Sequence, residues 1–154
     1  MNELLIARGL NLRPLWNDLR QRFRADQISL SLLPPSDDES LPRRALVELN
    51  PSALIQRLNE GVGQEGWSLE YYVWGDDLYT GRLTILGATR EGLIRDPSLV
   101  NASARAFRLA AGRFGIGDRL FDHVTPVEID ADGHIAHPEE VHRRLRREGR
   151  IHQS

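Results

Sequence analysis

The sequence predicts an α+β fold in which an antiparallel β-hairpin or sheet packs against helices. Segments with apolar residues at helical spacing occur near the start, in the middle and at the end of the chain. Between them lie segments in which apolar and polar residues alternate, as in half-buried strands. Two of these alternating segments are separated only by Gly75, Asp76 and Asp77, a spacing typical of an antiparallel hairpin. The 154 residues, 40% apolar and 27% charged, are expected to form a single domain, residues 1–154.

The first half of the chain predicts two helices and two strands. Residues 14–24 predict a short amphipathic helix, because their large apolar side chains share one helical face. Residues 28–33 alternate like a strand, and residues 34–42 predict a flexible acidic loop that contains three prolines. Strand character resumes over residues 43–49. Residues 50–60 predict a helix, because they begin with an Asn that can cap it and a Pro that its first turn tolerates.

The second half predicts a hairpin followed by two helices. Residues 67–74 alternate and predict its first strand, and residues 78–90 predict one long return strand that bends at its glycines. Residues 96–113 begin with Asp-Pro and predict a helix whose many alanines permit close packing on a sheet. Residues 124–135 hold an Asp-Gly turn between short apolar runs, and residues 137–150 predict a basic C-terminal helix.

Composition excludes several classes of function. The chain has no Cys, which excludes a disulfide framework, a thiolate metal site and a cysteine nucleophile. All 20 basic residues are Arg and face 22 acidic ones, so an anion site must be local rather than a property of the whole charge. No run of about 18 apolar residues could span a bilayer, and Glu3 lies where a signal peptide carries basic residues. We expect a cytoplasmic protein with no membrane partner.

Motifs of the common enzyme classes are absent from the sequence. There is no G-x-S-x-G turn, no phosphate-binding loop ending in Gly-Lys-Ser and no HExxH zinc motif among the five His residues. We therefore expect no enzymatic activity, no catalytic residue, no metal or other cofactor and no small-molecule substrate.

Arginines at regular spacing are the candidates for a nucleic-acid site. Two share a polar stripe of the helix predicted over 96–113, where they can follow a phosphate backbone. Two lie in the return strand predicted over 78–90, and two begin the strand predicted over 43–49. In this order the pairs are Arg105 and Arg108, Arg82 and Arg90, and Arg43 and Arg44.

Two further groups of residues have more than one interpretation. The aromatic residues of the strand over 67–74 are expected in the core or in subunit contacts, the commoner outcome for aromatic residues in strands. The C-terminal arginines either bind nucleic acid or form a solvated helix end that suits the helix dipole. These are Arg143, Arg144, Arg146, Arg147 and Arg150.

The segment AFRLAAGRFGIGDRLFD, residues 106–122, resembles the helix and glycine turn of the Rad fifty-two single-strand annealing family. The resemblance extends backwards in the same order. Residues 44–70 resemble that family's strand, helix and Gly-Trp strand, and residues 81–91 resemble its next strand. It is greatest to DNA damage response members and covers about residues 14–122, which leaves residues 123–154 as a hairpin and the basic helix.

The resemblance implies a non-enzymatic, nucleoid-associated protein in DNA repair and recombination. Such a protein would form a homo-oligomeric ring whose hairpins and helices line a groove for single-stranded DNA, and would protect DNA ends or promote strand annealing. Arg108 falls at the first residue of the family's DNA-contacting basic pair, and with Arg105 it is expected to contact phosphates. Leu109 falls at the second residue of that pair, and Arg105 falls where the family commonly has Asp.

These departures keep a second hypothesis open. A divergent member could retain the oligomeric scaffold and act as a protein-interaction or regulatory module without DNA binding. A third hypothesis concerns residues 128–139, whose acidic residues and Gly133 fit the spacing of a calcium-binding loop. Because Glu128 replaces the usual Asp and Pro126 prevents an entering helix, a hairpin with an Asp-Gly turn is the simpler explanation.

Overall fold

A computed structural model describes residues 11–96, 99–120 and 126–153 of the chain, and it confirms the α+β class. Within these ranges there are four α-helices and two three-stranded antiparallel sheets. The chain divides into two compact units, and each is assembled from segments that are far apart in the sequence. The first unit contains the residues up to Gln21 together with Pro51–Asp118, and the second contains Arg22–Asn50 and the residues from Arg119 onwards.

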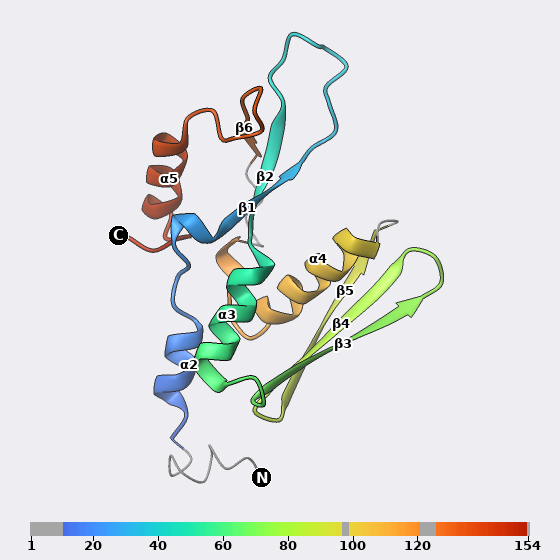
Figure 1. Ribbon diagram of the computed structural model, residues 1–154, viewed down its shortest axis with the longest axis vertical. Coiled ribbons are helices and arrows are strands. Elements are labelled where there is room, and N and C mark those ends of the chain that lie inside the picture. The colour runs from blue at the N-terminus through green and yellow to red at the C-terminus, as the bar shows by residue number, and fades with distance from the viewer. Residues whose placement is uncertain (1–10, 97–98, 121–125, 154) are drawn as a thin grey trace. The chain divides into compact units, whose positions relative to one another are not determined.

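The first unit is a sheet with helices. Its helices are α2 (Arg13–Leu19), α3 (Pro51–Val62) and α4 (Leu99–Gly112). Its strands are β3 (Trp67–Trp74), β4 (Leu78–Ile85) and β5 (Ala88–Arg95), which pair in that order. Figure 1 shows α4 lying along this sheet.

Glycines in the sheet let α4 pack closely on it. A Cβ atom at Gly81 would lie 3.1 Å from Ala106, and one at Gly92 would lie 2.5 Å from the Ala106 carbonyl oxygen. The helix presents fully buried alanines to the sheet, as its composition predicts. Small residues on both elements therefore fix which face of the sheet the helix covers.

The second unit contains a smaller sheet and the basic helix. Its elements are the 3₁₀ turn η1 (Ala25–Gln27), β1 (Ile28–Leu32), β2 (Arg44–Leu49), β6 (Pro126–Glu128) and α5 (Pro138–Arg147). The strand order is β1-β2-β6. A second 3₁₀ turn, η2 (Asp118–Leu120), lies where the chain passes from one unit to the other. The buried Leu145 anchors the apolar side of α5.

The prediction of one long strand over 78–90 is wrong. The chain turns at Leu86 and Gly87, whose φ angles are +49° and +87°, and β5 then returns beside β4 over eight residues. A two-residue turn with both φ angles positive is the geometry that joins twisted antiparallel strands tightly. Leu is an uncommon residue at such a φ angle, so the sequence signal for this turn was a lone Gly.

The first helix is shorter than predicted, ending at Leu19 rather than near residue 24. The Arg57 guanidinium on α3 donates hydrogen bonds to the carbonyl oxygens of Leu19 (2.9 Å) and Gln21 (2.7 Å). These carbonyls would otherwise accept the next backbone bonds of a continuing helix. The Arg57 side chain thus supplies the hydrogen bonds that end α2.

The other predicted elements are confirmed within three residues at their ends, including the Asn-Pro start of α3 and the hairpin turn after β3. The predicted helices over 96–113 and 137–150 are observed as α4 and α5, and Pro97 of the predicted Asp-Pro start lies outside the described residues. The predicted acidic loop, residues 34–42, connects β1 to β2 and contains a turn at Asp38. Among the described residues, no helix has the length and apolar character needed to cross a membrane.

Candidate nucleic-acid interface

The sheet of the first unit has one face under α4 and one open face. Residues directly opposite each other on paired strands lie on the same face. The glycines under α4 pair with each other across β4 and β5, so the alternate residues point to the open side. The open face carries Glu70, Tyr72 and Trp74 of β3, Arg82 of β4, and Glu91, Leu93 and Arg95 of β5.

Two aromatic rings lie next to each other on this open face. The ring centroids of Tyr72 and Trp74 are 6.4 Å apart, and the ring planes differ by 27°. Trp74 is 58% exposed, although its indole N–H donates a 3.0 Å hydrogen bond to the Thr80 hydroxyl. That bond fixes the ring across the sheet surface and leaves its other side to solvent. An immobilised, exposed aromatic ring is a ready stacking surface for a planar ligand.

Arg82 completes this cluster. Its guanidinium carbon lies 4.7 Å from the centroid of the Tyr72 ring, within the range of a cation–π contact. It also donates a 3.1 Å hydrogen bond to the Tyr72 hydroxyl and a 2.8 Å hydrogen bond to the Glu91 carboxylate. We call Tyr72, Trp74 and Arg82 the aromatic–arginine cluster.

Neighbouring carboxylates raise the pKa values of two members of the cluster. The Tyr72 hydroxyl donates a 2.6 Å hydrogen bond to Glu70, which raises the pKa of Tyr72 above its ordinary value of 10.0. The hydrogen bond to Glu91 raises the pKa of Arg82. Arg95 at the end of the same face pairs with Asp77 at 2.9 Å. The arginines of the open face therefore carry their own counter-charges.

Arg82 and Arg90 do not share a face. The turn at residues 86–87 places Arg90 on β5, where its neighbour Glu91 is the partner of Arg82. Arg90 therefore points to the side of α4, and its guanidinium carbon lies 5.2 Å from the centroid of the Phe114 ring. The sequence-based expectation of one basic strand is wrong here, because it rested on a single uninterrupted strand.

Arg105 and Arg108 on α4 differ in environment. Arg105 forms an ion pair of 3.3 Å with Asp96, and 43% of its side chain is exposed. Arg108 is only 7% exposed. The predicted polar stripe of α4 is therefore half-exposed at Arg105 and buried at Arg108.

Arg43 and Arg44 belong to the second unit. Arg44 begins β2 and is paired in register with Glu128 on β6. Arg43 is exposed and donates a 3.3 Å hydrogen bond to the Leu33 carbonyl oxygen. The six predicted arginines thus divide into four of the first unit and two of the second.

The aromatic residues of β3 follow the parity of the strand. Trp67 stacks on Phe107 with centroids 6.0 Å apart, and the Tyr71 hydroxyl donates to the Ser103 carbonyl oxygen at 3.0 Å. Partial burial raises the pKa of Tyr71. Tyr72 and Trp74 have the parity of Ser68 and Glu70, the polar side of the strand. The alternation predicts which side each ring takes, but the expectation of a place in the core is wrong for Trp74, which is 58% exposed. A place in subunit contacts stays a prediction.

The proposed calcium loop contains the Asp-Gly turn. Asp130 accepts backbone hydrogen bonds from Asp132 (2.9 Å) and His134 (3.0 Å), and Gly133 has a φ of +83°. Ligand atoms of Asp130, Asp132 and His134 lie within 4.8 Å of one another, and all three residues are exposed. β6 precedes this turn in place of the helix that a calcium-binding helix–loop–helix requires. The turn explains the arrangement without an ion.

Compared with known proteins, the sequence matches no protein-family model, and no curated protein is significantly similar to it.

Proposed function

We propose that this protein is a non-enzymatic, DdrA-like single-stranded DNA-binding protein that acts in DNA damage repair, protecting DNA ends or promoting strand annealing. The observation that carries the proposal is the aromatic–arginine cluster on the open face of the β3-β4-β5 sheet. Binding of single strands without sequence preference uses aromatic rings on which bases stack, together with cations that meet the phosphates. The resemblance to the annealing family is the second support.

In this proposal, bases stack on Trp74 and Tyr72 while Arg82 exchanges its carboxylate partner for a phosphate. Trp74 offers the larger and more exposed ring. None of the remaining arginines predicted from the sequence belongs to the open face. That Arg43, Arg44, Arg90, Arg105 and Arg108 add phosphate contacts in a homo-oligomeric ring is a separate part of the proposal, which the salt dependence of binding tests. The ring assembly is likewise part of the proposal.

The open face favours one alternative. Trp74 and Leu93 are 58% and 56% exposed, and both arginines of this face are already paired with carboxylates. Exposed apolar side chains of this kind also mark protein–protein contacts. The alternative is that the protein keeps an oligomeric scaffold and acts as an interaction module without DNA binding.

Fluorescence anisotropy of a labelled oligothymidine with a 5′-hydroxyl end tests the proposal. Each base–aromatic stack contributes about 1–3 kcal/mol, so Trp74→Ala should weaken binding by about fivefold to about 150-fold. Val73→Ala is the matched control, because Val73 is 56% exposed and adjacent in sequence but points to the other side of the strand.

Equal affinity of Trp74→Ala and the wild type would overturn the stacking site. Failure of the wild-type protein to bind the oligonucleotide at low salt would favour the interaction-module alternative. Sedimentation velocity of the same samples measures whether the wild-type protein is oligomeric, which both hypotheses expect.

A further inference from the structure

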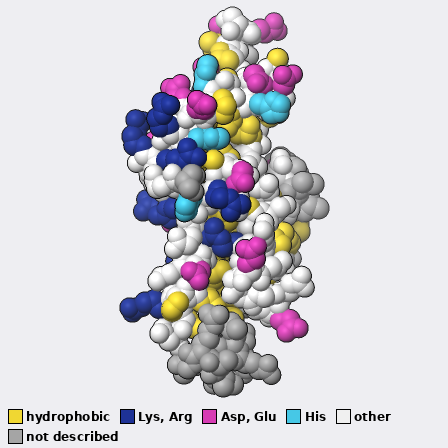
Figure 2. All heavy atoms as spheres, turned by 60° about the vertical axis from the view of Figure 1, so that its left-hand side comes forward, with side chains coloured by type: hydrophobic (Ala, Val, Ile, Leu, Met, Phe, Trp, Pro, Cys, Tyr) yellow, Lys and Arg dark blue, Asp and Glu magenta, His cyan; other side chains and the backbone are white. Residues whose placement is uncertain are grey.

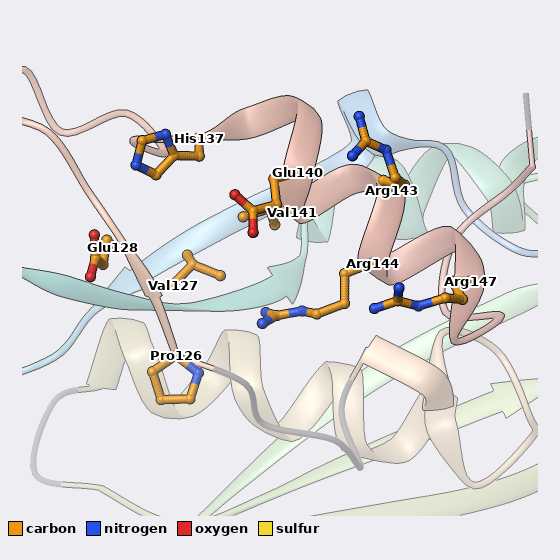
Figure 3. A pocket seen from close by; sticks show the side chains of 9 residues that line it. All are labelled: Pro126, Val127, Glu128, His137, Glu140, Val141, Arg143, Arg144 and Arg147. Carbon is orange, nitrogen blue, oxygen red and sulfur yellow. The ribbon is translucent and has the colours of Figure 1, made fainter.

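A hollow in the second unit lies between α5 and β6. It has a volume of about 490 Å³ and is lined by residues of these two elements and of the turn that joins them. Figure 3 shows its lining, with Arg144 and Arg147 extending from α5 towards the same side. Figure 2 shows that arginine side chains gather on this part of the molecule.

Arginines of α5 give the hollow its chemistry. Arg144 and Arg147 are three positions apart on the helix, so they lie on neighbouring parts of one face. Arg143 also lines the hollow. Leu145 is fully buried and anchors the helix in the core of the unit. The helix thus brings the guanidinium groups of Arg144 and Arg147 to one side of the hollow, whereas Figure 3 shows that of Arg143 extending to another side.

Arg144 has side-chain donors that are shielded from solvent and have no partner in the described part of the chain. Its Nε and one terminal nitrogen are shielded from solvent, and within the described ranges neither has a hydrogen-bond acceptor. A guanidinium stays charged at any accessible pH and has five N–H donors. Burial of such donors without a partner is costly, so native proteins normally satisfy them. The missing partner is an acceptor, and an anion supplies both acceptor atoms and counter-charge.

Acidic residues at the hollow do not meet this need. Glu128 and Glu140 also line it, but among the residues described here neither carboxylate lies within ion-pair distance of Arg144. His137 at the start of α5 adds a further potential donor. Pro126, Val127 and Val141 provide an apolar wall.

We propose that this hollow binds a terminal phosphate group, a phosphomonoester, on a molecule about the size of a mononucleotide. Planar guanidinium groups match two phosphate oxygens at once, which favours phosphate over a monatomic anion. The volume lies in the range of small-ligand sites and exceeds what a bare phosphate needs. The apolar wall suits the uncharged part of the ligand. Two sources share this chemistry, a free nucleotide and the phosphorylated end of a DNA strand.

Isothermal titration calorimetry with adenosine 5′-monophosphate tests the site, at constant ionic strength in a buffer without phosphate. We expect binding of the monophosphate and none of adenosine. Arg144→Gln should weaken binding at least tenfold. Arg146→Gln is the matched control, because Arg146 lies on the same helix but does not line the hollow. Arg147→Gln, at an exposed position, provides a second lining variant should Arg144→Gln fail to fold.

Three results would overturn the proposal. The first is that neither the monophosphate nor inorganic phosphate binds, and the second is that adenosine binds as tightly as the monophosphate. The third is that Arg146→Gln loses as much affinity for the monophosphate as the two lining variants do. A comparison of 5′-phosphorylated and 5′-hydroxyl oligonucleotides then separates the two sources. Tighter binding of the phosphorylated strand than of the hydroxyl strand, lost in Arg144→Gln, assigns a strand end, and equal binding of the two strands assigns a free nucleotide. Because the test of the sheet face uses a 5′-hydroxyl strand, failure of one site leaves the other testable.

Discussion

Gly92→Ala tests whether α4 covers the face of the sheet opposite the aromatic–arginine cluster. A Cβ atom at this position would lie 2.5 Å from the Ala106 carbonyl oxygen and 2.8 Å from the backbone nitrogen of Ala110. An ordinary contact begins at about 3.4 Å, so the helix must move away by several tenths of an ångström. Both atoms belong to the helix backbone, and no side-chain rotation can relieve the overlap.

Overpacking of this kind costs about 1–3 kcal/mol. Replacing Gly with Ala also reduces the entropy of the unfolded chain, which offsets about 0.4–1 kcal/mol of that cost. From the central values of these two ranges, about 2 and about 0.7 kcal/mol, we expect Gly92→Ala to lower the free energy of unfolding by about 1.3 kcal/mol, measured by urea denaturation followed by circular dichroism. Gly112→Ala at the end of α4 is the control, because its nearest neighbour atom is at 3.7 Å. It should be neutral or stabilising, by up to about 1 kcal/mol.

A Gly92→Ala protein as stable as the wild type would refute the reasoning. It would mean that α4 does not rest on Gly92, and the assignment of the open face would lose its basis. A loss of stability in Gly112→Ala equal to that in Gly92→Ala would show that alanine is tolerated poorly for a reason unrelated to the distance between helix and sheet.

Three further substitutions probe local features. Leu86→Asn should raise the free energy of unfolding by about 1 kcal/mol in the same denaturation assay, because Asn tolerates the positive φ angle of this turn better than Leu. Arg57→Met should lower it by about 1–3 kcal/mol, since the carbonyl of Leu19 loses a charged donor. Hydrogen bonds from Ser40 lower the pKa of Asp38 below 3.8, so they favour folding above that pH and are lost as the pH falls through the lowered value. Ser40→Ala should raise this pKa towards 3.8 in a carboxylate NMR titration.

Most elements of the fold were predictable because local patterns determine them. The alternation of β3, the Asn-Pro start of α3 and the small-residue content of α4 are properties of short segments. The turn between β4 and β5 was missed because Leu86 occupies a position at which Asn, Asp or Gly is the usual signal. The end of α2 was missed because its cause, Arg57, lies 38 residues further along the chain.

The candidate sites were harder to predict than the helices and strands, because they depend on which residues the fold brings together. Arg82 and Arg90 were assigned to one side of one strand, and the missed turn moved Arg90 to the other face of the sheet. The division into two discontinuous units also has no linear signal, because each unit combines an early and a late segment. Arg144 was one of five similar arginines in the sequence, and no local pattern shows that two of its side-chain nitrogens become shielded beside a hollow.

The salt dependence of DNA binding can decide how many arginines take part. Each phosphate neutralised on a single strand contributes about −0.7 to the slope of log K against log salt concentration. If all six predicted arginines contacted phosphates, the slope would be about −4. Arg82 and Arg95 on the open face are already paired with carboxylates, so a strand stacked on this face would neutralise at most two phosphates there.

We therefore expect a slope between about −0.7 and about −1.4 for a strand held mainly by the aromatic–arginine cluster, measured by anisotropy from low to moderate salt. Glu91→Gln should strengthen binding, because it frees Arg82 from its carboxylate partner. A slope near −4 that is unchanged in Trp74→Ala would contradict this, because phosphate contacts away from the open face would then supply the affinity. A slope near −1 that disappears with binding in Trp74→Ala would identify stacking as the main source of affinity, with the carboxylates of Glu70 and Glu91 limiting the electrostatic share.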